Sequence, residues 1–431
     1  MTEIDATHTD SAPRPWARSV THRLWLLSEA TRILDFYQYA VIQAQGGFHD
    51  LDDFGRPLPT GWPPMPVPGF TLFQTTRMVH CFALAHLMGR PGAADVVDHG
   101  MDALWQRHRD SEHGGYYWHN SLDGVLDDSK QAYGHAFVLL AAATAKCAGH
   151  PDADRLLSDI SDVLDTRFWE KNTGAMAEEF DRDWTPRSDY RGQNSNMHLV
   201  EGLMAACEAT GERGYLRMAE SIADVIVNQA ARLNSWRIPE HYDRHWTIDR
   251  DYDGGVFRPY GSLPGHWLEW SRLLVQLWEV GGRQHPWMPE AATILFGKAI
   301  EEGWDPLRGG FYLTVGWDGT PVDRDRYWWP CNEGSAAAAV LGHWSDDPLY
   351  HDWYRTIWNW CERHLIDRDS GGWRHQLNDD LVPSVNPWYG KPDIFHAFQS
   401  CLLPLISPTH GLGHTLRDHG IHLDSDSMIG R

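Results

Sequence analysis

Two histidines lie near expected helix starts, in segments whose other residues suit proton transfer. His396 lies in NPWYGKPDIFHAFQSCLLP (386–404), where a Gly-Lys-Pro-Asp turn precedes an apolar run. His266 lies in PGHWLEWSR, three residues before Glu269, so both side chains share one face of a helix. A carboxylate beside an imidazole raises its basicity and orients its ring, as acid–base catalysis requires. For each histidine taken alone, a hydrogen-bonded core residue is the alternative.

A second group of polar residues suits the binding of a hydroxylated ligand. In RGQNSNMHLVEG, Asn194 and His198 lie four residues apart on one helix face, and Glu201 follows three residues later. A polar N-cap and a satisfied core histidine would explain the same pattern. Arg77 lies in an apolar helix start, where a buried arginine needs a carboxylate partner or a ligand. An internal ion pair is the alternative for this arginine.

Glu333 follows two tryptophans in the segment RYWWPCNEGSAAAA. An acidic residue at a helix start is ordinary capping. Beside Trp328 and Trp329, inside a cavity, the same carboxylate would bind sugar hydroxyls. The 23 tryptophans of the chain fit either stacking platforms for sugar rings or a large aromatic core.

These residues recur at a nearly constant interval along the chain. Successive separations are 58, 63, 68, 67 and 63 residues in the series Arg77, His135, His198, His266, Glu333 and His396. Gly-plus-aromatic turns recur as well, at 113–118, 309–313 and 371–375, with a weaker relative at 172–176. The chain therefore contains six repeats, each long enough for two helices and a long loop.

Two kinds of helical segment alternate in these repeats. One kind is apolar nearly all round, at 74–89, 129–145, 192–211, 264–281, 330–344 and 391–404. The other kind is amphipathic, as at 93–108, 216–233 and 350–365. We predict an all-α (α/α)6 barrel of six inner and six outer helices, a single domain over 19–410. A flexible tail is expected over 1–18 and a C-terminal extension over 411–431. The starts of the inner helices would meet at one cavity.

Composition excludes several classes of partner. The net charge of −22 comes with no cluster of Lys and Arg, which argues against nucleic acid and anionic membranes. No apolar run approaches the roughly 20 residues that cross a bilayer. The first residues lack the basic start and apolar core of a signal peptide. Six scattered cysteines without a C-x-x-C pair indicate reduced thiols, so we expect a cytoplasmic protein.

Cofactor motifs are also missing from the sequence. Four histidines of the repeat series could surround one point, but H-E-x-x-H, H-x-H and paired cysteines are absent. Walker-type loops, dinucleotide Gly-rich loops and Gly-x-Ser-x-Gly are absent too. We therefore predict no metal and no cofactor.

Six segments together resemble the N-acylglucosamine 2-epimerase superfamily, from about residue 20 to 408. They are RMVHCFALAHLMGRPGAADVVDHG, DDSKQAYGHAFVLLAAATA, YRGQNSNMHLVEG, PGHWLEW, WWPCNE and GKPDIFH. The likeness is greatest to the aldose–ketose isomerase branch, the mannose and sulfoquinovose isomerases. It implies an (α/α)6 barrel with no required metal or redox cofactor. It also implies that His266 and His396 are catalytic. The residues implied to bind the sugar are Arg77, Asn194, His198, Glu269, Trp329 and Glu333.

The activity implied is reversible aldose–ketose isomerisation of a monosaccharide, D-mannose to D-fructose, with D-lyxose to D-xylulose as a related reaction. In this hypothesis His396 moves a proton between C2 and C1 through a cis-enediol(ate). His266 opens the sugar ring, and Glu269 tunes His266. The alternative is that the two histidines exchange these roles. Pro392 and His375 depart from the sulfosugar isomerases, which favours a neutral hexose.

Other functions remain open on the sequence. A sugar 2-epimerase and a sulfoquinovose isomerase of the same family are the nearest. An (α/α)6 glycoside hydrolase, with Glu269 and Glu333 as its two carboxylates, is more remote. A catalytically silent protein that binds a sugar or another protein is the last alternative.

Overall fold

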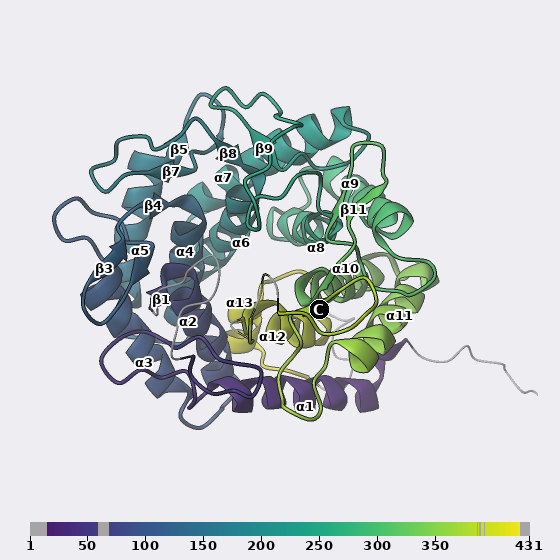
Figure 1. The fold of residues 1–431 in the computed structure, drawn as a ribbon, viewed down its shortest axis with the longest axis horizontal. Helices are drawn as coiled ribbons and strands as arrows, with labels where there is room; N and C mark the ends of the chain where they lie inside the picture. Colours follow the sequence, from purple (N-terminus) through teal and green to yellow (C-terminus); the bar gives the residue numbers. More distant parts are fainter. Residues whose placement is uncertain (1–14, 59–68, 386, 388, 392, 423–431) are drawn as a thin grey trace, which may run out of the picture.

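The helices of the computed structural model form two concentric rings (Figure 1). The structure describes residues 15–58, 69–385, 387, 389–391 and 393–422. Within them, the inner ring consists of α2 (Leu72–Leu87), α4 (Ala132–Cys147), α6 (Gln193–Thr210), α8 (Pro264–Val280), α10 (Trp328–Ser345) and α12 (Phe395–Leu402). The outer ring consists of α1 (Val20–Tyr37), α3 (Ala93–Ala103), α5 (Ala153–Val163), α7 (Arg213–Ala223), α9 (Trp287–Lys298) and α11 (Pro348–His364). The predicted (α/α)6 barrel is confirmed.

The two rings differ in burial as their sequences predict. Helix α5 buries Leu156, Leu157 and Ile160 on one face, at the 3.6-residue period of an amphipathic helix. Inner helix α4 buries all but two of its side chains, because α2 and α6 pack against its sides and α5 against its outer face. Four outer helices continue as π-helical turns, at η2 (Leu104–His108), η3 (Leu164–Phe168), η4 (Asp224–Ala231) and η5 (Ala299–Gly303).

The Gly-plus-aromatic turns carry a repeated ion pair that holds the inner-helix starts. In each turn an acidic residue, four positions before a glycine of positive φ, pairs with a cation just ahead of the next inner helix. The pairs are Asp110–Lys130 at 3.0 Å, Glu170–Arg191 at 2.6 Å, Asp305–Arg326 at 2.5 Å and Asp367–Lys391 at 2.7 Å. Three of the pairs are buried, all but Glu170–Arg191, and breaking one of these would leave an uncompensated charge, so they fix where the helices begin.

Short antiparallel strands connect each repeat to the next one. The strands are β1 (Phe70–Thr71), β2 (His119–Asn120), β3 (Val125–Asp127), β4 (Lys130–Gln131), β5 (Trp169–Glu170), β6 (Ala175–Met176), β7 (Glu179–Phe180), β8 (Arg191–Gly192), β9 (His241–Tyr242), β10 (Thr314–Val315), β11 (Pro321–Asp323), β12 (Arg326–Tyr327) and β13 (Gln376–Leu377). They pair as β1-β2-β3, β4-β7, β5-β6, β8-β9, β10-β11 and β12-β13. The strand before α2, α4, α6 or α10 pairs with a strand that precedes the following inner helix. This pairing gathers the helix starts at one end of the barrel.

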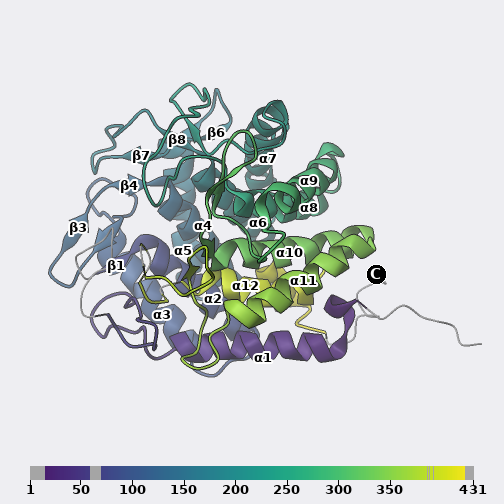
Figure 2. The same ribbon diagram turned by 45° about the vertical axis from the view of Figure 1, so that its right-hand side comes forward.

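The C-terminal segment closes the opposite end. After the 3-10 turn η6 (Leu403–Leu405), helix α13 (Leu412–Asp418) packs against α2, α4 and α6, inside the ring (Figures 1 and 2). Gly413 approaches Cys147 at the end of α4, and Gly411 approaches Glu208 near the end of α6. The extension predicted over 411–431 is therefore integrated with the barrel as far as residue 418.

Three further sequence predictions can be compared with the described residues. The 3-10 turn η1 (Trp16–Arg18) buries Ala17, so residues 16–18 do not belong to the flexible tail predicted over 1–18; residues 1–14 lie outside the described part. All six cysteines are buried and unpaired. In the described part of the chain, no helix combines the length and the apolar character that a membrane crossing requires.

Candidate active site

The starts of the inner helices surround a cavity of about 480 Å³. Seven of the eight predicted site residues line it, namely Arg77, Asn194, His198, His266, Glu269, Trp329 and His396. Glu333 is not among the described residues that line the cavity, and neither is His135 of the repeat series. The His135 ring is held instead by Gln131 O at 2.7 Å and by the backbone N–H of Tyr116 at 3.0 Å.

His266 is oriented by a carboxylate that lies far from it in the sequence. Glu240 Oε2 lies 2.8 Å from His266 Nδ1, and the second oxygen, Oε1, accepts the backbone N–H of Leu263 at 3.2 Å. Gln193 Nε2 donates to the same Glu240 Oε2 at 2.7 Å, since Trp270 Nε1 already donates to the amide oxygen of Gln193. With Nδ1 engaged, Nε2 is the His266 nitrogen left for a ligand.

The prediction that Glu269 tunes His266 is wrong. Although the two residues share a helix face, the Glu269 carboxylate accepts from Arg272 Nη2 at 3.1 Å, one turn further along α8. Its nearest imidazole is that of His198, whose Nδ1 lies 3.6 Å from Glu269 Oε1. The helical spacing of three correctly predicted that His266 and Glu269 share a face. It did not predict the contact, because the buried guanidinium of Arg272 attracts the Glu269 carboxylate more strongly than the His266 imidazole does.

His396 forms a relay with Glu333 and Arg272. Glu333 Oε1 lies 2.8 Å from His396 Nδ1, and Glu333 Oε2 accepts from Arg272 Nε at 2.6 Å. Burial by itself would raise the pKa of Glu333, but Arg272 and His396 outweigh it and the pKa is lowered. An ionised Glu333 accepts the Nδ1 proton of His396 and leaves Nε2 as the basic nitrogen. Glu333, predicted to bind the sugar, contacts His396 in the structure.

Trp329 lies between the two histidines. Its ring centroid is 4.9 Å from that of His266 and 6.0 Å from that of His396. A flat apolar surface flanked by two imidazoles suits a sugar ring, whose C–H face packs on an aromatic ring while its oxygens meet polar groups.

Three carboxylates share one guanidinium below the cavity. Arg272, fully buried, contacts Glu201, Glu269 and Glu333 at 3.3, 3.1 and 2.6 Å. Burial, followed by the charges of Glu333 and Glu201, raises the pKa of Glu269 well above its usual range. Glu269 is therefore the protonated member of the set, and its Oε2, which has no partner among the described residues, is free to donate to a ligand.

Two groups of side chains here have the composition of a metal site. They are His198, Glu201 and Glu269, and Glu269, Glu333 and His396. Both groups include carboxylates that contact Arg272. The guanidinium supplies at this point the positive charge that a cation would bring.

Arg77 combines both interpretations made from the sequence. It pairs with Asp393 at 3.1 Å, donates to Tyr133 Oη at 2.7 Å and also lines the cavity. Its guanidinium lies over the rings of Phe137 and Phe395, at 4.5 and 4.9 Å. The arginine is thereby held rigidly, with its charge already balanced.

Asn194 and His198 present polar atoms to the cavity, as predicted. Asn194 Oδ1 is buried and has no hydrogen-bond partner among the described residues. Burial lowers the pKa of His198 to about 3, so this imidazole is neutral at pH 7. Both groups are suited to uncharged hydroxyls.

The last predicted helix begins later than expected. Helix α12 starts at Phe395 rather than near residue 391, because Asp393 Oδ1 accepts the backbone N–H of Phe395 at 3.2 Å. Lys391 is bound to Asp367 outside the helix, and Pro392 lies outside the described residues.

Comparison with known proteins identifies the family. Residues 46–400 match the model of the N-acylglucosamine 2-epimerase (GlcNAc 2-epimerase) family. The chain belongs to this family. It is 41% identical to the D-mannose isomerase of Pseudomonas cannabina pv. alisalensis over 410 residues, 93% of this chain and 95% of the relative. It is also 41% identical to the D-mannose isomerase of Thermobifida fusca over 415 residues, 94% and 99% of the two chains.

A solved relative agrees in fold. The crystal structure of a D-mannose isomerase superposes with a TM-score of 0.83 at 32% identity, covering 92% of this chain and 99% of the relative. The family predicted from six short segments is confirmed.

Sequence reasoning missed Glu240, although a repeat points to it. The segments EEFDRDWTP (178–186) and EHYDRHWTI (240–248) align without gaps. Their first residues hold equivalent places in this N-acylglucosamine 2-epimerase family member. Glu178 Oε1 accepts from Ser195 at the start of α6, and Glu240 contacts His266 at the start of α8. Aligning the hairpins, and not only the helices, would have found this carboxylate.

The cavity wall carries more acidic than basic groups. The acidic residues that line it are Glu178, Glu179, Glu240, Glu269 and Asp393, against two arginines, Arg77 and Arg258. Each arginine is already paired, Arg77 with Asp393 and Arg258 with Glu179 at 3.1 Å. A negatively charged ligand would find no unpaired arginine or lysine among the described lining residues.

His375, expected to influence substrate choice, does not line the cavity. Its ring stacks on Trp328, with centroids 3.9 Å apart. Trp328 does line the cavity. An effect of His375 on the ligand would pass through its neighbours that line the cavity, Trp328 and Asp393.

Proposed function

We propose that this protein interconverts D-mannose and D-fructose. The observation that carries the proposal is a pair of histidines in one cavity, each with Nδ1 on a buried carboxylate and Nε2 available to a ligand. The relatives named D-mannose isomerase, at 41% identity over nearly the whole chain, support the same reaction.

His396 performs the proton transfer in this proposal. Its Nε2 takes the C2 proton of the open-chain aldose, which leaves a cis-enediolate with negative charge on O1. The O2 hydroxyl proton passes to O1, and the imidazolium returns its proton to C1 on the same face. The C2–H bond is broken, a C1–H bond is formed, and O2 becomes the ketose carbonyl oxygen. Ionised Glu333 stabilises the imidazolium that forms in between.

Glu269 and His266 serve the two other steps. The protonated Glu269 donates a hydrogen bond to the enediolate oxygen, as oxyanion stabilisation requires. His266, oriented by Glu240, moves the proton from O1 to O5 when the pyranose opens. One base beside C1 and C2 is enough for isomerisation, whereas epimerisation needs a base on each face of C2.

The charge of the cavity supports a neutral sugar as substrate. The ionised carboxylates of the lining would repel a sulfonate or a phosphate. Both lining arginines are already paired, and burying such a group without a free cation is costly. Polar groups such as Asn194 Oδ1 are suited to hydroxyls instead.

The test is product analysis with mannose deuterated at C2. We expect fructose as the product, retention of part of the label at C1, and unchanged turnover after treatment with EDTA. Glucose without fructose would support the 2-epimerase instead. Turnover that is abolished by EDTA and restored by a divalent ion would contradict the metal-independent mechanism. Release of phenol from aryl glycosides would support a hydrolase.

A further inference from the structure

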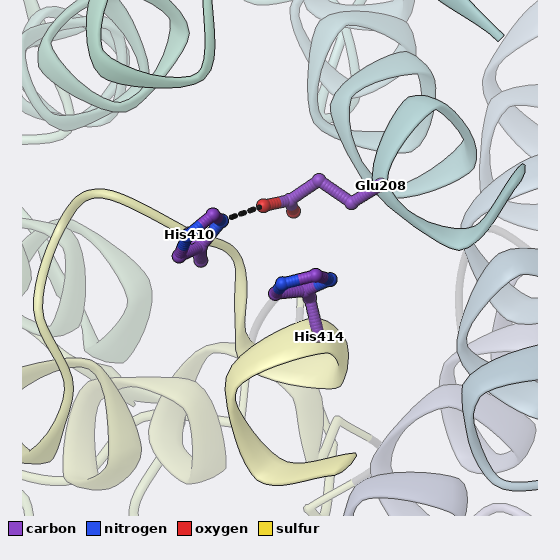
Figure 3. A group of neighbouring side chains, drawn as sticks. All are labelled: Glu208, His410 and His414. Atoms are coloured by element: carbon purple, nitrogen blue, oxygen red, sulfur yellow. Dashed lines mark hydrogen bonds and ion pairs between the residues drawn. The ribbon is translucent and has the colours of Figure 1, made fainter. Parts of the chain in front are cut away.

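Two histidines and a glutamate come together at the end of the barrel opposite the cavity. They are Glu208, near the end of α6, and His410 and His414, which flank the start of α13 (Figure 3). One ligand-type atom of each lies within 4.8 Å of the others. Glu208 is fourteen residues after Asn194 on the same helix, which places it about 21 Å further along the axis at 1.5 Å per residue. The active site does not use these residues.

We propose that Glu208, His410 and His414 bind a divalent cation of the zinc class. Two imidazoles and one carboxylate are a donor set that Zn²⁺ accepts, with a fourth position left for water. The ligands come from two segments, so a bound ion would fasten the C-terminal segment, which carries α13, to inner helix α6.

The present contacts show how an ion would enter. His410 Nδ1 lies 3.0 Å from Glu208 Oε1 (the dashed line in Figure 3), so the cation would take the place of the proton between them and release it to solvent. The Glu208 side chain is 7% exposed, whereas those of His410 and His414 are 44% and 20% exposed. The carboxylate is thus fixed inside the fold while the imidazoles face a path from solvent.

Two side chains next to His414 affect metal binding: Asp418 would support it, and Arg417 competes with it. Asp418 Oδ2 lies 3.3 Å from His414 Nε2 and can accept its N–H, as carboxylates do behind metal-bound histidines. Arg417 Nη2 donates to His414 Nδ1 at 3.2 Å, so this nitrogen carries a lone pair. The guanidinium must leave that lone pair when the metal binds there. It stays bound to Asp418 through Nε at 2.6 Å.

Ordinary ion pairing is the competing explanation, and the chain offers a matched control for it. His285, 43% exposed, lies 3.8 Å from Glu220, which pairs one half-exposed histidine with one glutamate. The groups of metal-ligand type among the described residues do not include this pair. His285→Ala therefore removes a comparable histidine without touching the proposed site.

The experiment is titration of the tag-free, full-length protein with Zn²⁺ and with Co²⁺, after EDTA treatment and removal of the chelator. We expect one ion per chain by calorimetry, a visible ligand-field spectrum with Co²⁺, and a higher Tm with Zn²⁺. His410→Ala, His414→Ala and Glu208→Gln should each weaken binding by at least about tenfold, a difference of 1.4 kcal/mol. Glu208→Gln keeps an oxygen for the backbone N–H of Gly411, which Glu208 accepts at 2.9 Å, so it should fold.

The control variant and the folding check distinguish metal binding at this site from other effects. His285→Ala should bind as the wild type does, and circular dichroism should show that all variants are folded. The proposal is overturned if the wild type binds no stoichiometric ion, if the three variants bind as well as the wild type, or if Zn²⁺ leaves Tm unchanged. Turnover of mannose should not respond to occupancy of this site, so failure here leaves the proposed isomerase activity intact.

Discussion

Replacing Glu333 by glutamine should slow isomerisation much more than the same replacement at Glu269. Both carboxylates contact Arg272 and are almost isosteric with glutamine. They differ in protonation, since Glu333 is ionised and contacts His396, whereas the raised pKa of Glu269 keeps it neutral. Glutamine therefore imitates the native state of Glu269 and removes the charge of Glu333.

The magnitude follows from the contact that is lost. A hydrogen bond to a charged group contributes about 1.5–3 kcal/mol, and each 1.36 kcal/mol of barrier is a factor of ten in rate. Glu333→Gln should thus reduce kcat about 10- to 150-fold. KM should change little, because Glu333 does not line the cavity. Glu269→Gln keeps a hydrogen-bond donor and should cost less than about tenfold, whereas Glu269→Ala removes the donor and should cost about 100-fold.

Steady-state fructose formation from mannose, with Tm and circular dichroism as checks on folding, measures these effects. A larger deuterium isotope effect with C2-labelled mannose would place the loss in the proton-transfer step. If Glu269→Gln is as damaging as Glu333→Gln, the assignment of the proton to Glu269 is refuted.

Three further predictions concern the hairpins, the buried histidines and the repeated ion pair. Glu240→Gln should lower kcat/KM by at least about tenfold through loss of a charge-assisted contact to His266, while Glu178→Gln, at the equivalent place in the neighbouring repeat, should cost little. The free energy of unfolding, measured in denaturant titrations, should fall steeply as pH drops from 6.5 towards 4. Burial lowers the pKa of His108 to about 4 and that of His135 to about 3, so in this range the unfolded chain binds protons that the folded chain does not. The loss is up to about 1.4 kcal/mol per histidine and pH unit. A constant free energy of unfolding between pH 7.5 and 5 would contradict this. Asp305→Ala should cost about 3 kcal/mol, because the buried Arg326 would keep only the half-exposed Asp379, at 3.3 Å, as a carboxylate partner. Asp352→Ala breaks an exposed pair with Arg355 and should cost less than about 1 kcal/mol.

The sequence predicted the rings because helical periodicity is a local property. The outer helices alternate apolar and polar faces, the inner ones do not, and the interval of about 60 residues fixes their number. Seven of the eight predicted site residues line the cavity for the same reason, since a residue near the start of an inner helix has little freedom about which way it faces. The late start of α12 was missed because it depends on the side chain of Asp393.

Helical periodicity did not predict which side chain each buried carboxylate contacts. Which imidazole a glutamate meets depends on rotamers and on segments far away in sequence, as Glu240 to His266 and Glu333 to His396 show. The spacing of three between His266 and Glu269 competes with the same spacing between Glu269 and Arg272, and the carboxylate contacts the fully buried cation. The expectation that His135 would face the cavity was wrong for a similar reason. The backbone N–H of Tyr116, in the preceding Gly-aromatic turn, donates to its Nε2.

Equivalent repeats have therefore become chemically different positions of one ring. Four of the inner helices, α2, α4, α6 and α10, are preceded by a strand that pairs with the next repeat, and α4, α6, α10 and α12 are preceded by an ion pair from the Gly-aromatic turn. The residues of the four ion pairs do not line the cavity, so the polar residue at each helix start is free to vary. At His266 and His396 a buried carboxylate lies 2.8 Å from Nδ1 and orients an imidazole that lines the cavity. The proposed catalysis therefore rests on these two histidines near Trp329, rather than on the histidines of the series as a whole.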